Sequence, residues 1–134
     1  MAWTVRHAGN GMPEMNAHEP AGRHLLATLA GCSAAILDDE ALLYAAVEQA
    51  AAATGATVLQ IAIHHFTPHG VTAMALLAES HASLHTYPER GVAFWDCFTC
   101  GASCHPEQSL SVLQELLSPK HIEHQIVERI AGSR

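Results

Sequence analysis

The sequence predicts an α+β fold, a two-layer sandwich in which a mainly antiparallel sheet carries two helices on one face. Two observations lead to this prediction. In the middle of the chain, strand-like segments follow one another with only short turns between them, which favours hairpins over the long crossovers that parallel strands need. On each side of these strands, one segment has apolar residues at helical spacing. The predicted order of elements is β-α-β-β-β-β-α-β.

The first strand and the first helix are predicted from the residues that begin and end them. Residues 24–30 are interpreted as a strand, although their leucines and alanines would suit a helix equally well. A helix is expected over residues 39–54, because acidic residues at 38–40 supply N-cap and first-turn carboxylates. Apolar residues then recur at helical spacing, and Gly55 marks the end of this helix.

The remaining elements follow from alternating apolar side chains and from turn residues. Thr67-Pro-His-Gly70 is a turn signal between two strands of a hairpin, and Pro106 is suited to a helix start. The expected elements are strands at 57–66, 71–79, 81–86 and 91–98, a helix at 106–117 and a last strand at 122–130. Because both helices cover one face, the other face of the sheet would be bare in a monomer. We therefore expect a homodimer with a four-layer α-β-β-α arrangement.

Composition excludes several classes of function. At 134 residues the chain is long enough for one domain, which we assign to residues 21–134 after a mobile N-terminal extension at 1–20. Thirteen acidic against six basic residues give a net charge of −7, which argues against a nucleic-acid or anionic-membrane partner. The sequence has no apolar run of about 20 residues and no signal-peptide core, so a cytoplasmic location is expected. In that compartment the four cysteines would be thiols.

A polar cluster that directly follows the most strand-like apolar run indicates where chemistry takes place. Burying an unpaired carboxylate or imidazole is costly, so such a cluster usually has a function. It consists of Glu79, Ser80, His81, Ser83 and His85. A serine hydroxyl can attack the carbonyl of the preceding residue, and elimination from the resulting ester followed by hydrolysis leaves a pyruvoyl group and ammonia. We predict that the chain cuts itself between Glu79 and Ser80.

This self-cleavage needs a base for the Cα proton and donors for the oxyanion. His81 and His85 are the nearby candidates. Because His81 adjoins Ser80, a regular strand would point its side chain to the opposite face, which favours His85. Thr72 and His85 lie eight and five residues from Ser80, about 26 and 17 Å along an extended chain. Either a tight turn brings them back, or those of another copy approach Ser80 across a two-fold axis; the bare face favours the second arrangement.

Several separated motifs occur in an order that is found in one family. They are Gly22-Arg-His24, Gly31-Cys32, Phe66-Thr-Pro-His-Gly-Val-Thr72, Ala78-Glu-Ser-His81, His85-Thr-Tyr-Pro-Glu89 and Phe98-Thr-Cys-Gly101. On these motifs the sequence resembles the prokaryotic S-adenosylmethionine decarboxylase proenzymes, the short, pyruvoyl-dependent and metal-independent type. The resemblance covers nearly the whole chain and leaves out residues 1–20.

The resemblance implies a role for each matching residue. Cleavage before Ser80 would give a β chain, residues 1–79, and an α chain, residues 80–134, that begins with the pyruvoyl group. His85 matches the family's processing histidine. Thr72 stands where many members have a processing serine, and it keeps the hydroxyl. Cys100 matches the proton donor that quenches the carbanion after carbon dioxide has left.

The resemblance also implies a substrate and a cofactor. Phe66 and Tyr87 match positions of the adenosyl pocket, and Glu89 matches a ribose-binding position. Tyr87 departs from the tryptophan that is common there, but it can still stack on a purine. The pyruvoyl group from Ser80 would form a Schiff base with the amine of S-adenosylmethionine and act as an electron sink, so that no metal is expected. The product would supply the aminopropyl group for spermidine synthesis.

Two other functions remain open at this stage. The same processing could serve a pyruvoyl-dependent arginine or ornithine decarboxylase, which would not need the purine contacts. The chain could instead be an unprocessed metal-binding or dimerisation module, because four possible zinc ligands occur close together. They are Cys97, Cys100, Cys104 and His105, and they lack the second Cys-x-x-Cys pair of a strong zinc signature.

Overall fold

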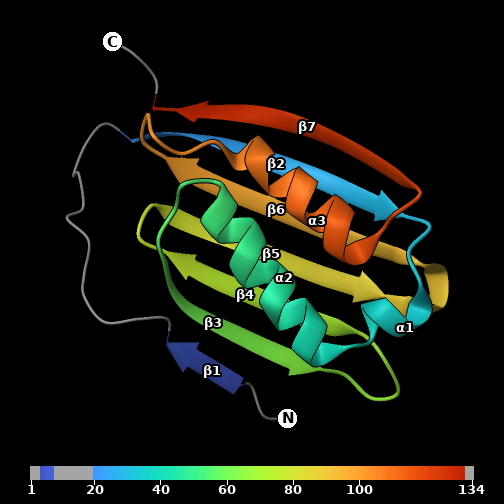
Figure 1. Cartoon of the computed structure of the whole chain (residues 1–134). Coiled ribbons are helices and arrows are strands. Elements are labelled where there is room, and N and C mark those ends of the chain that lie inside the picture. The colour runs from blue at the N-terminus through green and yellow to red at the C-terminus, as the bar shows by residue number, and fades with distance from the viewer. Residues whose placement is uncertain (1–3, 8–19, 132–134) are drawn as a thin grey trace.

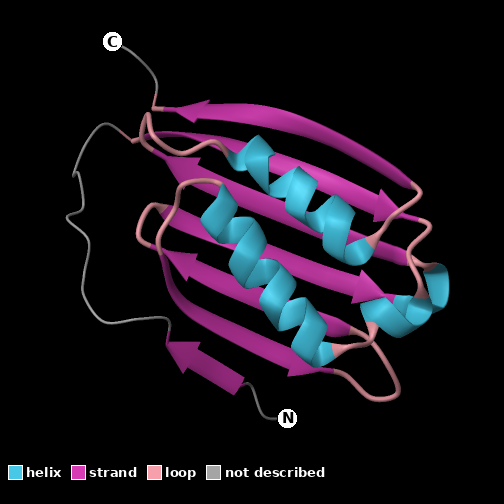
Figure 2. Ribbon diagram, in the orientation of Figure 1, coloured by secondary structure: helices cyan, strands magenta, loops and turns pink. Residues whose placement is uncertain are grey.

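The structure is a computed structural model that describes residues 4–7 and 20–131. It contains one antiparallel sheet of seven strands in the order β1-β3-β4-β5-β6-β2-β7. The helices all lie on one face of this sheet (Figures 1 and 2). The predicted two-layer α+β architecture is therefore confirmed. No helix in the described part of the chain is long and apolar enough to cross a membrane.

The elements follow the predicted order, with small additions. The strands are β1 (Thr4–His7), β2 (Ala21–Ala30), β3 (Val58–His65), β4 (Val71–Leu77), β5 (Ser80–Tyr87), β6 (Val92–Cys100) and β7 (His121–Ile130). The helices are α1 (Ala34–Leu37), α2 (Glu40–Ala53) and α3 (Ser109–Leu117), with 3₁₀ turns η1 (Pro88–Arg90) and η2 (Pro106–Gln108). The short α1, the two 3₁₀ turns and β1 were not expected from the sequence.

The N-terminal segment contains a strand where none was predicted. Residues 4–7 form β1, which pairs with β3 at the edge of the sheet. Backbone pairing can hold a segment without an apolar periodicity of its own, so pattern analysis does not find it. The other residues of the predicted extension, apart from Pro20, lie outside the described residues.

Helix α2 begins and ends where its capping residues predict. The Asp39 side chain accepts a hydrogen bond from the Leu42 backbone N–H at 3.0 Å, which satisfies one of the free donors of the first turn. The alanine-rich side of the helix faces the sheet, and Leu43, Ala46, Val47, Ala50 and Ala51 are completely buried. Small side chains there allow the helix to lie close to the strands.

The core fills the layer between the sheet and the helices. On β6, Trp95 is 1% exposed and its indole N–H donates to the Ser109 hydroxyl of α3 at 2.9 Å. Ser109 in turn donates to the Pro106 carbonyl at 2.6 Å, so every polar atom of this buried contact is paired. This contact joins helix α3 to the middle of the sheet.

The opposite face of the sheet is not covered by any described element. Met74, Leu76 and Phe94 point from it with 49%, 52% and 46% of their surface exposed. Polar side chains from β2, β4, β5 and β6 lie among these apolar ones, and they include His24, Thr72, His81, His85 and Asp96. We call it the open face.

Candidate active site

The bond between Glu79 and Ser80 lies at a tight hairpin. Leu77 of β4 pairs with Ser80 of β5, so that only Ala78 and Glu79 form the turn. Ser80 has a backbone φ of 147°, which lies in a region that residues other than glycine rarely adopt. Such a conformation costs about 1–3 kcal/mol and is held only by well-determined surroundings. The predicted cleavage bond is therefore strained on its Ser80 side.

Three hydrogen bonds fix the residues before this bond. The Glu79 carbonyl accepts from the Cys100 backbone N–H at 3.0 Å, and its carboxylate accepts from the Thr57 backbone N–H at 2.9 Å. The Ala78 N–H donates to the Thr57 carbonyl at 3.0 Å. The carbonyl that Ser80 would attack thus already has a backbone donor, which is the arrangement that stabilises a developing oxyanion.

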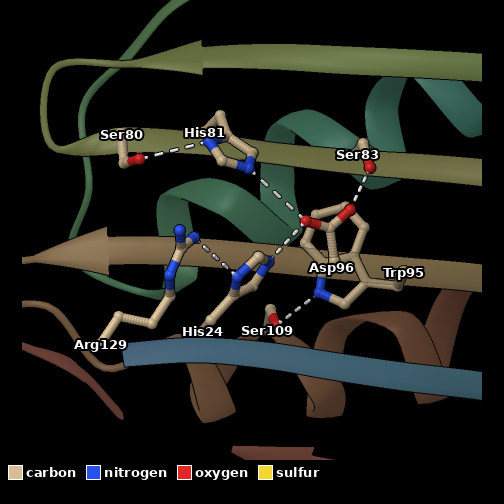
Figure 3. Close-up of polar contacts among 8 residues, drawn as sticks. All are labelled: His24, Ser80, His81, Ser83, Trp95, Asp96, Ser109 and Arg129. Carbon is tan, nitrogen blue, oxygen red and sulfur yellow. Dashed lines mark hydrogen bonds and ion pairs between the residues drawn. The ribbon is translucent and has the colours of Figure 1, made fainter. Parts of the chain in front are cut away.

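The hydroxyl of Ser80 begins a chain of polar contacts across the open face (Figure 3). Its Oγ lies 3.3 Å from His81 Nδ1, and His81 Nε2 lies 3.6 Å from Asp96 Oδ2. The same carboxylate oxygen is 2.8 Å from His24 Nε2, while the other oxygen of Asp96 accepts from the Ser83 hydroxyl. These contacts connect β5, β6 and β2.

The expectation that His81 points away from Ser80 is wrong. In a regular strand neighbouring side chains point to opposite faces, and Ser80 pairs with Thr99, a residue on the helix side that is 2% exposed. Because Ser80 has a positive φ, it departs from strand geometry, and its hydroxyl meets the His81 ring. Both His81 and His85 are therefore candidates for the base of the processing reaction.

His85 lies with Thr72 at the other end of β5. The two residues are direct partners in the β4–β5 register, and the Thr72 hydroxyl is hydrogen-bonded to His85 Nδ1. Tyr87 and Phe66 flank the histidine, with ring centroids 4.6 and 6.2 Å from that of the imidazole. The predicted processing pair and two predicted pocket residues thus form one cluster.

Glu89 is near the same end of the sheet, in η1, just after β5. Its carboxylate pairs with His69, which lies in the turn between β3 and β4. A hollow of about 540 Å³ on the open face continues from His85 past Phe94 to Asp96. Of the residues in this cluster, His85 lines the cavity, which extends from it toward the middle of the sheet.

The candidate residues form two groups that do not meet within one chain. Ser80 and Cys100 lie at one end of the open face, and Thr72 and His85 lie at the other. Because β5 is an unbroken strand, Ser80 and His85 are separated by about 17 Å, at about 3.3 Å per residue. A turn that brings His85 back to Ser80 is thereby excluded.

The four cysteines differ in their surroundings. Cys100 is half-buried beside the cleavage bond, whereas Cys32, Cys97 and Cys104 are buried. Burial and the neighbouring Asp96 carboxylate raise the pKa of the Cys97 thiol to about 12. Burial also raises the pKa values of Cys32 and Cys104. Of the four, Cys100 is the thiol that has both partial exposure and proximity to Ser80.

The possible zinc ligands near the end of β6 do not converge. Among the described residues, one group of three has all its potential ligand atoms within 4.8 Å of one another, and it is His24, His81 and Asp96. Sequence analysis missed His24 and Asp96 as site residues. A carboxylate in the middle of a strand, between the aromatic residues Trp95 and Phe98, is the signal that could have indicated Asp96.

The fold and the site together define a class of protein: a small α+β sandwich with a Glu-Ser-His sequence at a strained hairpin on an open sheet face. The sequence profile of the family described as S-adenosylmethionine decarboxylase matches residues 23–130. The chain therefore belongs to the S-adenosylmethionine decarboxylase family.

Individual relatives agree with this assignment. The S-adenosylmethionine decarboxylase proenzyme of Parasynechococcus marenigrum is 50% identical over 101 residues, which cover 75% of this chain and 79% of the relative. That of Methanococcus maripaludis is 39% identical over 108 residues, covering 81% and 88%. The crystal structure of the adenosylmethionine decarboxylase from Aquifex aeolicus superposes with a TM-score of 0.77 at 34% identity, covering 87% of this chain and 96% of that one.

Proposed function

We propose that this chain is a self-processing decarboxylase that converts S-adenosylmethionine to decarboxylated S-adenosylmethionine and carbon dioxide in the cytoplasm. The observation that carries the proposal is the Glu79–Ser80 peptide, whose carbonyl accepts from the Cys100 N–H while Ser80 adopts a strained backbone. Membership of the family and the names of the relatives support the reaction and the substrate.

Processing converts Ser80 into a pyruvoyl group in three steps. The hydroxyl attacks the Glu79 carbonyl, and the peptide becomes an ester. A base then removes the Ser80 Cα proton, the Cβ–Oγ bond of Ser80 breaks, and Glu79 leaves with Oγ as its new C-terminal carboxylate. Water finally releases ammonia from the dehydroalanine. Stored strain at Ser80 favours the first step, because breaking the C–N bond relieves the conformation.

The residues around Ser80 fit a pyruvoyl group at this position. When formed, that group supplies an electron sink for loss of the substrate carboxylate. Cys100 holds a proton on Sγ next to the same strand end and delivers it to the carbon that has lost carbon dioxide. Phe66 and Tyr87 stack on the adenine, and Glu89 binds the ribose hydroxyls. The net charge of −7 attracts a sulfonium substrate at long range.

We further propose that two copies of the chain form each active site. Ser80 and His85 of one chain are about 17 Å apart along β5, on a face that exposes Met74, Leu76 and Phe94. A two-fold axis through this face would place the His85 end of one copy over the Ser80 end of the other and bury the exposed apolar side chains. In this arrangement the partner's Thr72 and His85 assist processing at Ser80.

The intact mass of the purified protein under denaturing conditions tests processing. We expect two fragments that meet between Glu79 and Ser80, with the smaller one reducible by borohydride. Release of carbon dioxide from carboxyl-labelled S-adenosylmethionine, with arginine and ornithine as alternatives, then tests the substrate. A chain that stays uncut through long incubation would exclude the proposed enzyme, and turnover of arginine or ornithine alone would exclude the substrate.

Mixed dimers test whether the site is shared. A Ser80→Ala chain cannot be cut, and a His85→Ala chain has an intact Ser80 but no processing histidine. When the two variants are co-expressed with different tags, we expect cleavage of the His85→Ala chain in the mixed dimer, because its partner supplies His85. If His85 acted on the Ser80 of its own chain, co-expression would leave both chains uncut.

A further inference from the structure

The contacts of Ser80 point to a catalytic role for a residue outside the Thr72–His85 pair. We propose that His81, positioned by Asp96, is the base that activates Ser80 in the first step of processing, the shift of the Glu79 acyl group from nitrogen to oxygen. This inference rests on the proposed self-processing and assigns to a different histidine one step of that reaction.

The hydrogen bonds of His24 indicate the tautomer of its neutral ring. Arg129 Nη1 lies 3.3 Å from His24 Nδ1, and a guanidinium can only donate, so this nitrogen is the acceptor. The proton of a neutral His24 is then on Nε2, which donates to Asp96 at 2.8 Å. Asp96 accepts a second hydrogen bond from Ser83 on its other oxygen. Each oxygen of the Asp96 carboxylate therefore has a hydrogen-bond donor.

This carboxylate orients His81 toward Ser80. His81 Nε2 faces Asp96 Oδ2 at 3.6 Å, and a carboxylate there favours the tautomer with the proton on Nε2. The lone pair of Nδ1 is then directed at Ser80 Oγ, 3.3 Å away. Phe98 packs beside the imidazoles of His81 and His24, with centroid distances of 5.9 and 5.3 Å, which limits their rotation. Nucleophile, base and orienting carboxylate thus stand in sequence, as nucleophilic catalysis requires.

The charges around His81 are compatible with this role. Asp96 is the carboxylate that faces the ring from β6, and His24 approaches it edge-on from β2 at 5.8 Å between centroids. Arg129 of β7 lies over the Phe98 ring, 4.7 Å from its centroid, on the far side of His24. The charged group nearest to an imidazolium formed at His81 is therefore the Asp96 carboxylate. This arrangement stabilises the charge that appears when Ser80 gives up its proton.

The step balances without any added reactant. The Ser80 Oγ proton moves to His81 Nδ1 as Oγ forms a bond to the Glu79 carbonyl carbon. The carbonyl oxygen becomes an oxyanion that accepts from the Cys100 N–H. When the tetrahedral centre collapses, the C–N bond breaks and His81 returns the proton to the Ser80 nitrogen, which leaves an ester. Elimination from this ester needs a second base, and His85 of the partner copy serves that later step.

The side chains of His24, His81 and Asp96, whose potential ligand atoms lie within 4.8 Å of one another, do not suit a metal ion. A metal-bound histidine normally donates its other ring N–H to a carboxylate, carbonyl or water. The second nitrogen of His24 instead accepts from Arg129, so that a cation stands where an acceptor is needed. The positive charge of Arg129 also opposes a divalent ion at Asp96. The arrangement thus favours a proton relay over a metal centre.

Hydroxylamine cleaves esters but not ordinary peptide bonds, so it distinguishes a variant that fails in the acyl shift from one that fails in the elimination. Freshly made His81→Ala precursor should stay intact and resist hydroxylamine, since its acyl shift is slowed by about 10²- to 10⁴-fold, the contribution of a positioned base. His85→Ala precursor should be cut by hydroxylamine between Glu79 and Ser80, because its ester forms but cannot eliminate. Free imidazole should partly restore processing of His81→Ala. His121→Ala is the matched control, as His121 is exposed and also faces a carboxylate, that of Glu123.

The outcomes distinguish this inference from the proposed function. If the wild-type chain is never cut, the proposed function fails and the inference fails with it. If the wild-type chain is cut, and His81→Ala is processed at the wild-type rate or accumulates a hydroxylamine-sensitive ester, only the role of His81 is overturned.

Asp96→Asn provides a second variant in case His81→Ala does not fold, as judged by circular dichroism and melting. It keeps the size of the side chain but removes the orienting charge. We expect slow processing, no hydroxylamine-sensitive ester and recovery in Asp96→Glu. A folded Asp96→Asn chain that is processed at the wild-type rate would equally overturn the inference.

Discussion

Thr86 provides a direct test of how the His85 end of the site is held. Its side chain is 2% exposed and faces the helix layer, between His85 and Tyr87 in sequence. The hydroxyl accepts from the Val71 N–H at 2.9 Å and donates to the Leu37 carbonyl at 2.7 Å. It thereby connects β5 to the start of β4 and to the end of α1.

Replacing Thr86 with valine keeps the shape but removes both hydrogen bonds. Val71 and Leu37 are completely buried, so water cannot take the place of the hydroxyl. Each orphaned buried group costs about 1–3 kcal/mol, and the added buried methyl group offsets about 0.8 kcal/mol. We expect a loss of about 1–5 kcal/mol in the free energy of unfolding, or about 4–20 °C in melting temperature for a domain of this size.

Urea unfolding of unprocessed chains measures this difference. Every variant is made in the Ser80→Ala background, so that each protein unfolds as one chain. Thr86→Ser keeps the hydroxyl and should lose less than about 1 kcal/mol, and Thr57→Val changes an exposed threonine and should lie within about 0.5 kcal/mol of the parent. If Thr86→Val also lies within about 1 kcal/mol of the parent, the Thr86 hydroxyl does not stabilise the fold through these two buried groups.

Three further predictions concern titration, reactivity and the hairpin. Iodoacetamide at mildly alkaline pH should label Cys100 of the native protein before Cys97, because burial raises the pKa of the Cys97 thiol to about 12. Peptide mapping that found the reverse order of labelling would contradict the structure. Hydrogen bonds from the Gly70 backbone and from His65 lower the pKa of Asp38 below its ordinary value of 3.8, so the stability that Asp38 contributes is present at neutral pH and is lost as the pH falls below that value. Urea midpoints measured from pH 7 to 3 should therefore fall less steeply at the acid end for Asp38→Asn than for the parent. An unchanged slope would contradict this prediction. Glu79→Ala removes the acceptor for the Thr57 N–H and should slow processing several-fold in a mass-spectrometric time course. Glu79→Gln keeps an acceptor and should be processed at nearly the parental rate. Equal rates for the two variants would exclude a role for the Glu79–Thr57 hydrogen bond.

The chain sequence by itself determined the architecture and supplied the residue types on which the proposed chemistry depends. Turn residues and apolar periodicity predicted the two long helices and six of the seven strands, because these elements bury one face and follow local propensities. The cap at Asp39 fixed the start of α2 for the same local reason. The Glu79–Ser80 bond could be predicted as the cleavage site because its residue types and the surrounding motifs are read directly from the sequence.

The tertiary structure decided which of these residues meet. Strand pairing brings Asp96 of β6 and His24 of β2 to His81, and these contacts cross up to 72 positions of the sequence, which no local pattern encodes. The positive φ of Ser80 turned its hydroxyl toward His81, against the alternation of a regular strand. The register of an unbroken β5 likewise kept His85 away from Ser80, because side chains five residues apart on a strand cannot touch.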